Sequence, residues 1–199
     1  MQAGADVVGV DTSNELLSVA RSRGLDARWM DAAALEFSDE FDAVFSNAAL
    51  HWVLAPSAVA AGMHAALRRG GRLAVEFGGF GNIAAILTGL RAVLAAHGYR
   101  DLPPDQYYPT ASEYSTVLAG VGFVDIKAEL VSRPTPLADG MDAWLRTFRQ
   151  GLLEALGLTP SEQVEVRREV VELLAPSLRD AADNWIADYV RIRVTARRS

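Results

Sequence analysis

The 199-residue sequence contains no cysteine, and this excludes disulfide bonds, cysteine-based metal sites and thiol nucleophiles together. Histidine is scarce as well, with three residues at His51, His64 and His97. These histidines fall on different predicted elements and lack the spacing of metal ligands. We therefore expect no metal site.

Positive charge is also in short supply. Lysine and arginine number 19 against 25 acidic residues, and the net charge of −6 argues against a surface that binds nucleic acid by neutralising phosphates. A run of about 18 apolar residues, which a membrane span needs, is missing too. The N-terminus lacks the charged-then-apolar order of a signal peptide. We expect a cytoplasmic protein with neither a nucleic-acid nor a membrane partner.

What the sequence does contain is the composition of a globular domain. Apolar residues make up 50% and charged residues 22%, which is ordinary for a chain that buries a full core. The length suits one domain over residues 1–199.

The first half of the chain alternates short apolar segments with helical patterns. The predicted strands lie at residues 6–10, 27–30, 41–46 and 72–77. The predicted helices begin at Thr12, with a capping box to Glu15, at Pro56, which opens a helix to residue 69, and at residue 82. This order predicts a Rossmann-like α/β fold, with a mostly parallel sheet and helices on both faces.

The pattern is looser after Gly98. Residues 99–109 are rich in proline, tyrosine and aspartate and predict a loop. Helices are predicted at 110–119, 137–156 and 159–174, the last with a capping box at Thr159 and an end at Pro176. Strands are predicted at 123–132 and 186–196, and the alternation in the latter indicates a half-exposed antiparallel strand.

Four motifs occur in a fixed order within residues 3–77. They are GVDTSNELLSVAR, ARWMDAAAL, FDAVFSNAALHWV and ALRRGGRLAVEF. In this order they resemble a class I S-adenosylmethionine-dependent methyltransferase, of the methyltransferase type 11 or trans-aconitate methyltransferase-like kind. The resemblance implies S-adenosylmethionine as cofactor and a small molecule as methyl acceptor.

The predicted cofactor contacts follow strand ends. Asp11 ends its strand at the edge where open parallel sheets bind ligands, so its carboxylate can accept hydrogen bonds from both hydroxyls of a ribose. Thr12 beside it belongs to the same predicted contact. The resemblance implies that Asp31 accepts from the adenine amino group, with the Ala32 amide nearby. For each aspartate, the alternative is a role only as a helix cap.

The loop after the strand at 41–46 supplies the remaining predicted site residues. The resemblance places Asn47 beside the methionine part of the cofactor. His51 has an ordinary pKa near neutrality, which suits a catalytic base or a substrate clamp. The alternative for His51 is packing at the rim of the pocket.

Residues 99–174 are expected to form a substrate-side helical cover within the domain. Their aromatic and basic side chains offer apolar faces to a small organic substrate and positive charge to a carboxylate. The residues in question are Tyr107, Tyr108, Trp144, Phe148, Arg146 and Arg149. A helical pair that only covers the sheet is the alternative.

One motif of the family is not found. A first strand with a glycine-rich loop, of the type V-L-D-x-G-x-G-x-G, has no match, so we expect the first central strand to be missing from a truncated domain. This predicts two groups of strands, 6–10 with 27–30 and 41–46 with 72–77. It leaves open whether the chain is active. The alternatives are a non-catalytic binding or dimerisation module and a nicotinamide-dependent oxidoreductase.

Overall fold

The computed structural model describes residues 4–199, which form two compact units. Unit 1 comprises the described part of Met1–Phe77 together with Ser112–Ala128 and Arg193–Ser199. Unit 2 comprises Gly78–Ala111 and Glu129–Ile192. The expected cover at 99–174 is therefore divided, because residues 112–128 belong to unit 1. That these residues close over a substrate within one domain stays a prediction.

The first four described strands form two separate parallel pairs. In the first, β1 (Val8–Asp11) pairs with β2 (Asp26–Trp29), and in the second, β3 (Phe41–Asn47) pairs with β4 (Leu67–Gly78). Among the described residues, β1 and β3 are not paired with each other. The prediction of two groups of strands is confirmed.

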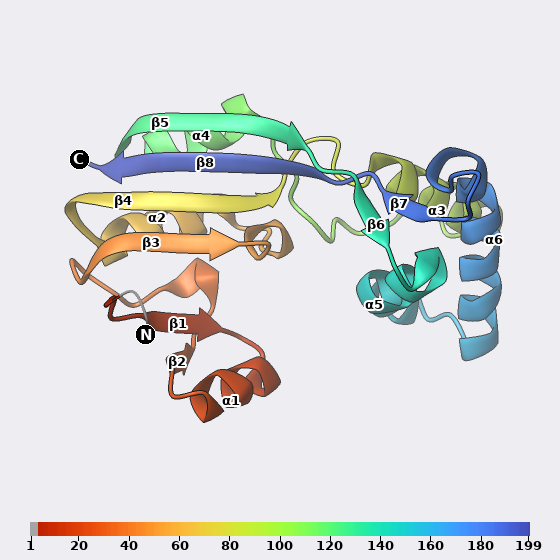
Figure 1. Cartoon of the computed structure of the whole chain (residues 1–199), viewed down its shortest axis with the longest axis horizontal. Helices are drawn as coiled ribbons and strands as arrows, with labels where there is room; N and C mark the ends of the chain where they lie inside the picture. The colour runs from red at the N-terminus through yellow and green to blue at the C-terminus, as the bar shows by residue number, and fades with distance from the viewer. Residues whose placement is uncertain (1–3) are drawn as a thin grey trace. The chain divides into compact units, whose positions relative to one another are not determined.

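The second pair belongs to a four-stranded sheet of order β3-β4-β8-β5. Its other two strands are β5 (Phe123–Ser132) and β8 (Val190–Arg198), and β8 runs antiparallel to its neighbours (Figure 1). The antiparallel direction of the last strand is therefore confirmed. The predicted strand at 186–196 is divided in two, because residues 188–189 interrupt it: the Asp188 carbonyl accepts from Ile83 N at 3.0 Å and the Tyr189 carbonyl accepts from Arg133 N at 2.8 Å.

The helices α2 (Pro56–Ala66) and α4 (Ala111–Gly120) lie behind the four-stranded sheet in Figure 1. Buried positions alternate along β4, as expected of a strand with one face on a core. Phe77 of β4 contacts the ring of Tyr114 in α4 at 5.0 Å, and His64 of α2 contacts Phe123 of β5 at 5.1 Å. These contacts hold α2 and α4 against the sheet.

The predicted end of the helix at residue 69 is wrong. Helix α2 ends at Ala66, and residues 67–71 already belong to β4. Phe41 pairs with Leu67 whereas Ala43 pairs with Arg72, so residues 68–71 bulge out of the ladder. Gly70 has φ of +75°, a conformation that glycine adopts without steric strain. The glycines thus permit a bulge instead of ending a helix.

The predicted capping box at Thr12 is also wrong, by one residue. Helix α1 (Asn14–Ser22) has Ser13 as its N-cap, and the Ser13 hydroxyl accepts from Leu16 N at 3.2 Å. The reason is that Asp11 Oδ1 accepts from Ser13 N at 2.8 Å, which turns the chain immediately after β1. Thr12 lies within this turn.

Unit 2 is mainly helical. Its helices are α3 (Ala84–Ala96), α5 (Gly140–Ala155) and α6 (Pro160–Leu178), and the short strands β6 (Thr135–Leu137) and β7 (Trp185–Ala187) form an antiparallel pair. Gly89 lets α3 approach α6 closely, because a Cβ at this glycine would lie 2.9 Å from Leu174 Cδ2. The apolar faces of the three helices form one buried core.

The sequence predicted the start of α6 correctly but not its end. The capping box is confirmed, because Glu162 N donates to the Thr159 hydroxyl and Thr159 N donates to the Glu162 carboxylate. The predicted end at Pro176 is wrong, since the helix continues to Leu178. Proline in the last turn removes one backbone donor but leaves the rest of the helix intact. Nowhere in residues 4–199 does a helix combine the length and apolarity needed to cross a membrane.

Candidate functional site

Asp11 and Asp31 lie at the carboxyl ends of neighbouring parallel strands. Asp11 pairs with Trp29 in the ladder, and Met30 N donates to the Asp11 carbonyl at 3.1 Å. Asp31 therefore follows directly on the paired residues. The Trp29 indole donates to the Thr12 carbonyl at 3.0 Å and ties the two strand ends together. The structure thus brings together the four predicted contacts for ribose and adenine.

Both aspartates also serve the backbone. Asp11 Oδ1 accepts from Ser13 N, and Asp31 Oδ1 accepts from Ala33 N as the N-cap of the short helix η1 (Ala32–Ala34), each at 2.8 Å. Both residues are exposed. Within the described chain, the second oxygen of each carboxylate keeps no protein donor. A capping role and a ligand-binding role are therefore compatible at each aspartate.

Asn47 and Glu76 are paired at the carboxyl ends of β3 and β4. Ala48 follows with φ of +56°, and its amide donates to the Glu76 carbonyl at 2.8 Å. The Glu76 carboxylate accepts from Arg193 Nε at 2.5 Å. This edge therefore presents an exposed amide side chain next to an acid that is already neutralised by an arginine.

His51 lies in the short helix η2 (Leu50–Trp52), which follows Asn47. Its side chain is buried, with 6% of its surface exposed, and its ring is tilted against Trp52 at 5.1 Å. This burial accords with packing at the rim of a site. The role of His51 as a base stays a prediction, as do the roles of the predicted cofactor contacts.

The segment after Asp31 connects the two strand pairs of unit 1. Leu35 packs against α2, where a Cβ at Gly62 would lie 3.1 Å from the Leu35 Cβ. Phe37 meets Phe41 at the start of β3 edge to face, with ring centroids 4.9 Å apart. Since all these residues belong to unit 1, the carboxyl ends of both strand pairs are held in one compact body.

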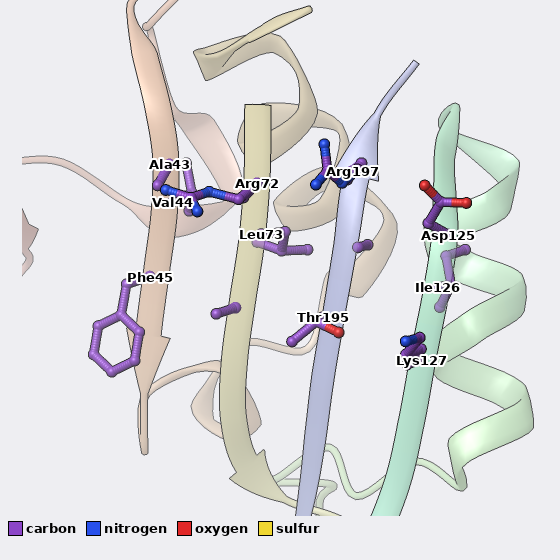
Figure 2. Close-up of a pocket in the computed structure, with 12 residues that line it drawn as sticks. Ala43, Val44, Phe45, Arg72, Leu73, Asp125, Ile126, Lys127, Thr195 and Arg197 are labelled. Carbon is purple, nitrogen blue, oxygen red and sulfur yellow. The ribbon is translucent and has the colours of Figure 1, made fainter. Parts of the chain in front are cut away.

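A hollow lies over the middle of the four-stranded sheet (Figure 2). It is lined from β3, β4, β8 and β5 and includes Phe45, whose side chain is 76% exposed. Arg72, Lys127 and Arg197 add positive charge. None of the predicted cofactor contacts lines this hollow. Residues 4–199 contain no group of three or more side chains arranged to hold a metal ion.

Unit 2 gathers several side chains of the expected cover. Arg149 is 1% exposed, and its guanidinium lies over the Trp144 ring at 5.7 Å. Burial raises the pKa of the nearby Tyr108 hydroxyl. Its hydrogen bonds and the positive charge of Arg149 lower this pKa, but they offset the effect of burial only in part. Phe148 packs on Trp144 at 5.1 Å, whereas Arg146 is exposed and pairs with Asp142 at 3.2 Å.

Sequence reasoning missed the partners of Arg149, which are Asp105 and Gln106 in the loop before Tyr108. A guanidinium on the buried face of an amphipathic helix requires acceptors. That requirement is the signal that could have directed attention to this loop.

The comparisons with known proteins agree with one another. A family model described as a methyltransferase domain matches residues 1–75. An uncharacterized methyltransferase of Schizosaccharomyces pombe is 32% identical over 204 residues, covering 96% of this chain and 77% of the relative. A trans-aconitate 2-methyltransferase of Deinococcus radiodurans is 30% identical over 158 residues, which cover 71% of this chain but only 59% of the relative.

Solved structures show the same fold. A Haemonchus contortus phosphoethanolamine N-methyltransferase, in complex with phosphomonomethylethanolamine and S-adenosylhomocysteine, superposes with a TM-score of 0.57 at 18% identity. The match covers 98% of this chain and 44% of that one. At this identity the likeness concerns the fold.

Proposed function

Because this chain belongs to the S-adenosylmethionine-dependent methyltransferases, we propose that it transfers the methyl group of S-adenosylmethionine to a small organic acid. S-adenosylmethionine is the cofactor. The observation that carries the proposal is the placement of Asp11 and Asp31 at adjoining carboxyl ends, each with one carboxylate oxygen available to a ligand. An acidic acceptor is supported by the relative named for trans-aconitate.

In this proposal the residues of unit 1 bind and orient the cofactor. Asp11 accepts from the ribose hydroxyls, with Thr12 in the turn beside it. Asp31 accepts from the adenine amino group, next to the Ala32 amide. Asn47 contacts the methionine end from the end of β3. Bound S-adenosylmethionine supplies an electrophilic methyl group on a sulfonium.

The chemistry asks for alignment more than for a base. An acceptor carboxylate oxygen forms a bond to the methyl carbon as the carbon–sulfur bond breaks, and the sulfur keeps the electron pair. The products are a methyl ester and neutral S-adenosylhomocysteine, so no proton moves. Holding the two groups in line can supply about 7–11 kcal/mol of the barrier. A buried His51 at the rim then shapes the acceptor side without abstracting a proton.

Titration of the chain with S-adenosylhomocysteine and with NAD tests the cofactor. We expect heat of binding with the first and none with the second. Incubation with methyl-labelled S-adenosylmethionine and di- or tricarboxylic acids tests transfer. Binding without transfer to any acid would support the non-catalytic module instead, and binding of NAD alone would support the oxidoreductase.

A further inference from the structure

Trp29 of unit 1 is an exposed tryptophan whose orientation is fixed by a hydrogen bond. Its indole Nε1 donates to the Thr12 carbonyl at 3.0 Å, yet 58% of the residue remains exposed. A single exposed apolar side chain is common on protein surfaces and by itself indicates nothing. At Trp29, however, the one polar atom of the side chain already has its partner, and the apolar ring is left open to solvent.

The other tryptophans of the chain use their rings within the protein. The sequence contains four tryptophans, and three of them lie against another ring or a guanidinium, namely Trp52, Trp144 and Trp185. Within the described chain, neither an aromatic ring nor a cation lies against the ring of Trp29. Trp29 thus combines a fixed orientation with a π face that a planar ligand can contact.

Trp29 points to the same side of its strand pair as the two aspartates of the candidate site. It is paired with Asp11 in the parallel ladder, and residues paired in this way point to one face of the sheet. The ladder continues through Met30 N, and Asp31 has the extended conformation, with φ of −77° and ψ of 132°. Since side chains alternate along extended chain, Asp31 also points to this side, about 6.6 Å further along. The indole therefore lies beside both carboxylates at the carboxyl edge.

Helix α1 covers this side of the strand pair at its amino end and leaves it open at its carboxyl end. Ala27, two residues before Trp29 and on the same side, is 7% exposed, and Arg21 of α1 donates to its carbonyl at 2.7 Å. Leu17 is the buried residue of the helix. The exposed fraction rises from Ala27 to Trp29, so the cover ends before the strand does. Trp29 is accessible where a ligand of the carboxyl edge would lie.

We propose that Trp29 is the stacking platform for the adenine of S-adenosylmethionine. The purine lies on the indole face, and the Asp31 oxygen without a protein donor accepts from its exocyclic amino group. Stacking fixes the plane of the base but hardly distinguishes one base from another, because every base has a π face. The carboxylate of Asp31 then recognises the amino group, while Asp11 holds the ribose. This assignment rests on the proposed function, which places the adenine beside Asp31.

Two substitutions separate stacking from the hydrogen bond to Thr12. Trp29→Phe keeps an aromatic face but loses the N–H donor, whereas Trp29→Leu loses both. S-adenosylhomocysteine is titrated calorimetrically into the whole chain and into each variant. The dissociation constant should rise about tenfold in Trp29→Leu, because stacking of a base on an aromatic side chain contributes affinity of this order, and should stay within about threefold of the parent in Trp29→Phe. An equal loss in both variants would assign the effect to the hydrogen bond and overturn the platform.

Phe45→Leu is the matched control. Phe45 is an aromatic residue of the same unit with 76% of its surface exposed, and it lines the hollow over the four-stranded sheet, away from the predicted cofactor contacts. This variant should leave the affinity for S-adenosylhomocysteine unchanged. Urea unfolding of all variants should remain cooperative, because both positions lie on the surface. A tenfold loss of affinity in Phe45→Leu as well would show that the effect does not belong to Trp29.

Tryptophan fluorescence supplies a readout that a purely structural role would not move. A purine stacked on an indole quenches its emission, so S-adenosylhomocysteine should lower the emission of the parent. Trp29→Phe, which keeps binding, should lose most of this quenching, and Phe45→Leu should keep it. Quenching that persists at full size in Trp29→Phe would overturn the platform.

Failure of the platform and failure of the proposed function give different results. A parent that binds S-adenosylhomocysteine, with unchanged affinity in Trp29→Leu, refutes the role of Trp29 alone. A parent that does not bind S-adenosylhomocysteine refutes the proposed function, and the platform with it.

Discussion

Replacing Asp11 by alanine tests the proposed ribose-binding role of this carboxylate beside its role in the turn after β1. Among the described residues, the Asp11 side chain accepts one hydrogen bond, from Ser13 N at 2.8 Å in an exposed turn. The loss of that bond should lower the unfolding free energy by about 0.5–1.5 kcal/mol, the net value of an ordinary intramolecular hydrogen bond. Removal of the proposed ribose contact should weaken the binding of S-adenosylhomocysteine by more free energy than this loss of stability.

The magnitude follows from the charge of the acceptor. Each hydrogen bond to a charged group contributes about 1.5–3 kcal/mol, and the proposed contact involves two ribose hydroxyls. Because Asp11 is exposed, water replaces part of this interaction, and we take about 1.5–3 kcal/mol for the two hydrogen bonds together. The dissociation constant of S-adenosylhomocysteine should rise about tenfold to a hundredfold.

The assay is calorimetric titration of S-adenosylhomocysteine into the parent and the variant, with urea unfolding of both as the measure of stability. Asp26→Asn is the matched control. It is an aspartate of the same strand pair, half exposed and bonded to Arg28, but it begins β2 and so lies at the amino end. It should leave cofactor affinity unchanged. Equal affinity of Asp11→Ala and the parent would refute the ribose assignment.

Three other changes report on stability. Thr159→Ala removes the capping box of α6 and should lower the unfolding free energy by about 1 kcal/mol in urea titration, whereas Ser161→Ala beside it should change it by less than about half of that. Leu145→Ala empties a fully buried position in unit 2 and should lower it by about 2–5 kcal/mol; a loss within the error of the urea midpoint would contradict the described core. Burial, aided by the charge of Arg198, lowers the pKa of His64 below its usual 6.5. The unfolded chain then binds the proton more readily, so stability should fall as pH drops through about 6.5, and His64→Gln should flatten this dependence. A pH profile that is unchanged in this variant would show that another group is responsible.

The four strands of these pairs could be predicted from local sequence pattern, because each strand is a short apolar segment close to a turn or a helix start. Asp11 and Asn47 end their strands close to where the sequence indicated. The pairing of β1 with β2 and of β3 with β4 follows from the missing glycine-rich motif. The positions of Asp11 and Asn47 at strand ends could therefore be predicted, whereas their roles as cofactor contacts stay predictions.

Features that depend on one particular contact could not be predicted from the periodicity of the sequence. The N-cap moved from Thr12 to Ser13 because the Asp11 side chain competes for the Ser13 amide. The strand β4 begins before its glycines because Phe41 of the preceding strand pairs with Leu67. Asp105 as the partner of Arg149 joins residues 44 positions apart, and no local periodicity encodes that contact.

The order of strands also has a consequence for how unit 1 forms during synthesis. β8 lies between β4 and β5, although it is the last of the described strands along the chain. Until residues near 198 have left the ribosome, β4 and β5 have no neighbour between them, and the apolar residues of both strands remain accessible. Such long-range pairing slows folding and lengthens exposure to aggregation. Unit 1 should therefore depend on chaperones during translation more than its size suggests, whereas the helices of unit 2 can associate earlier.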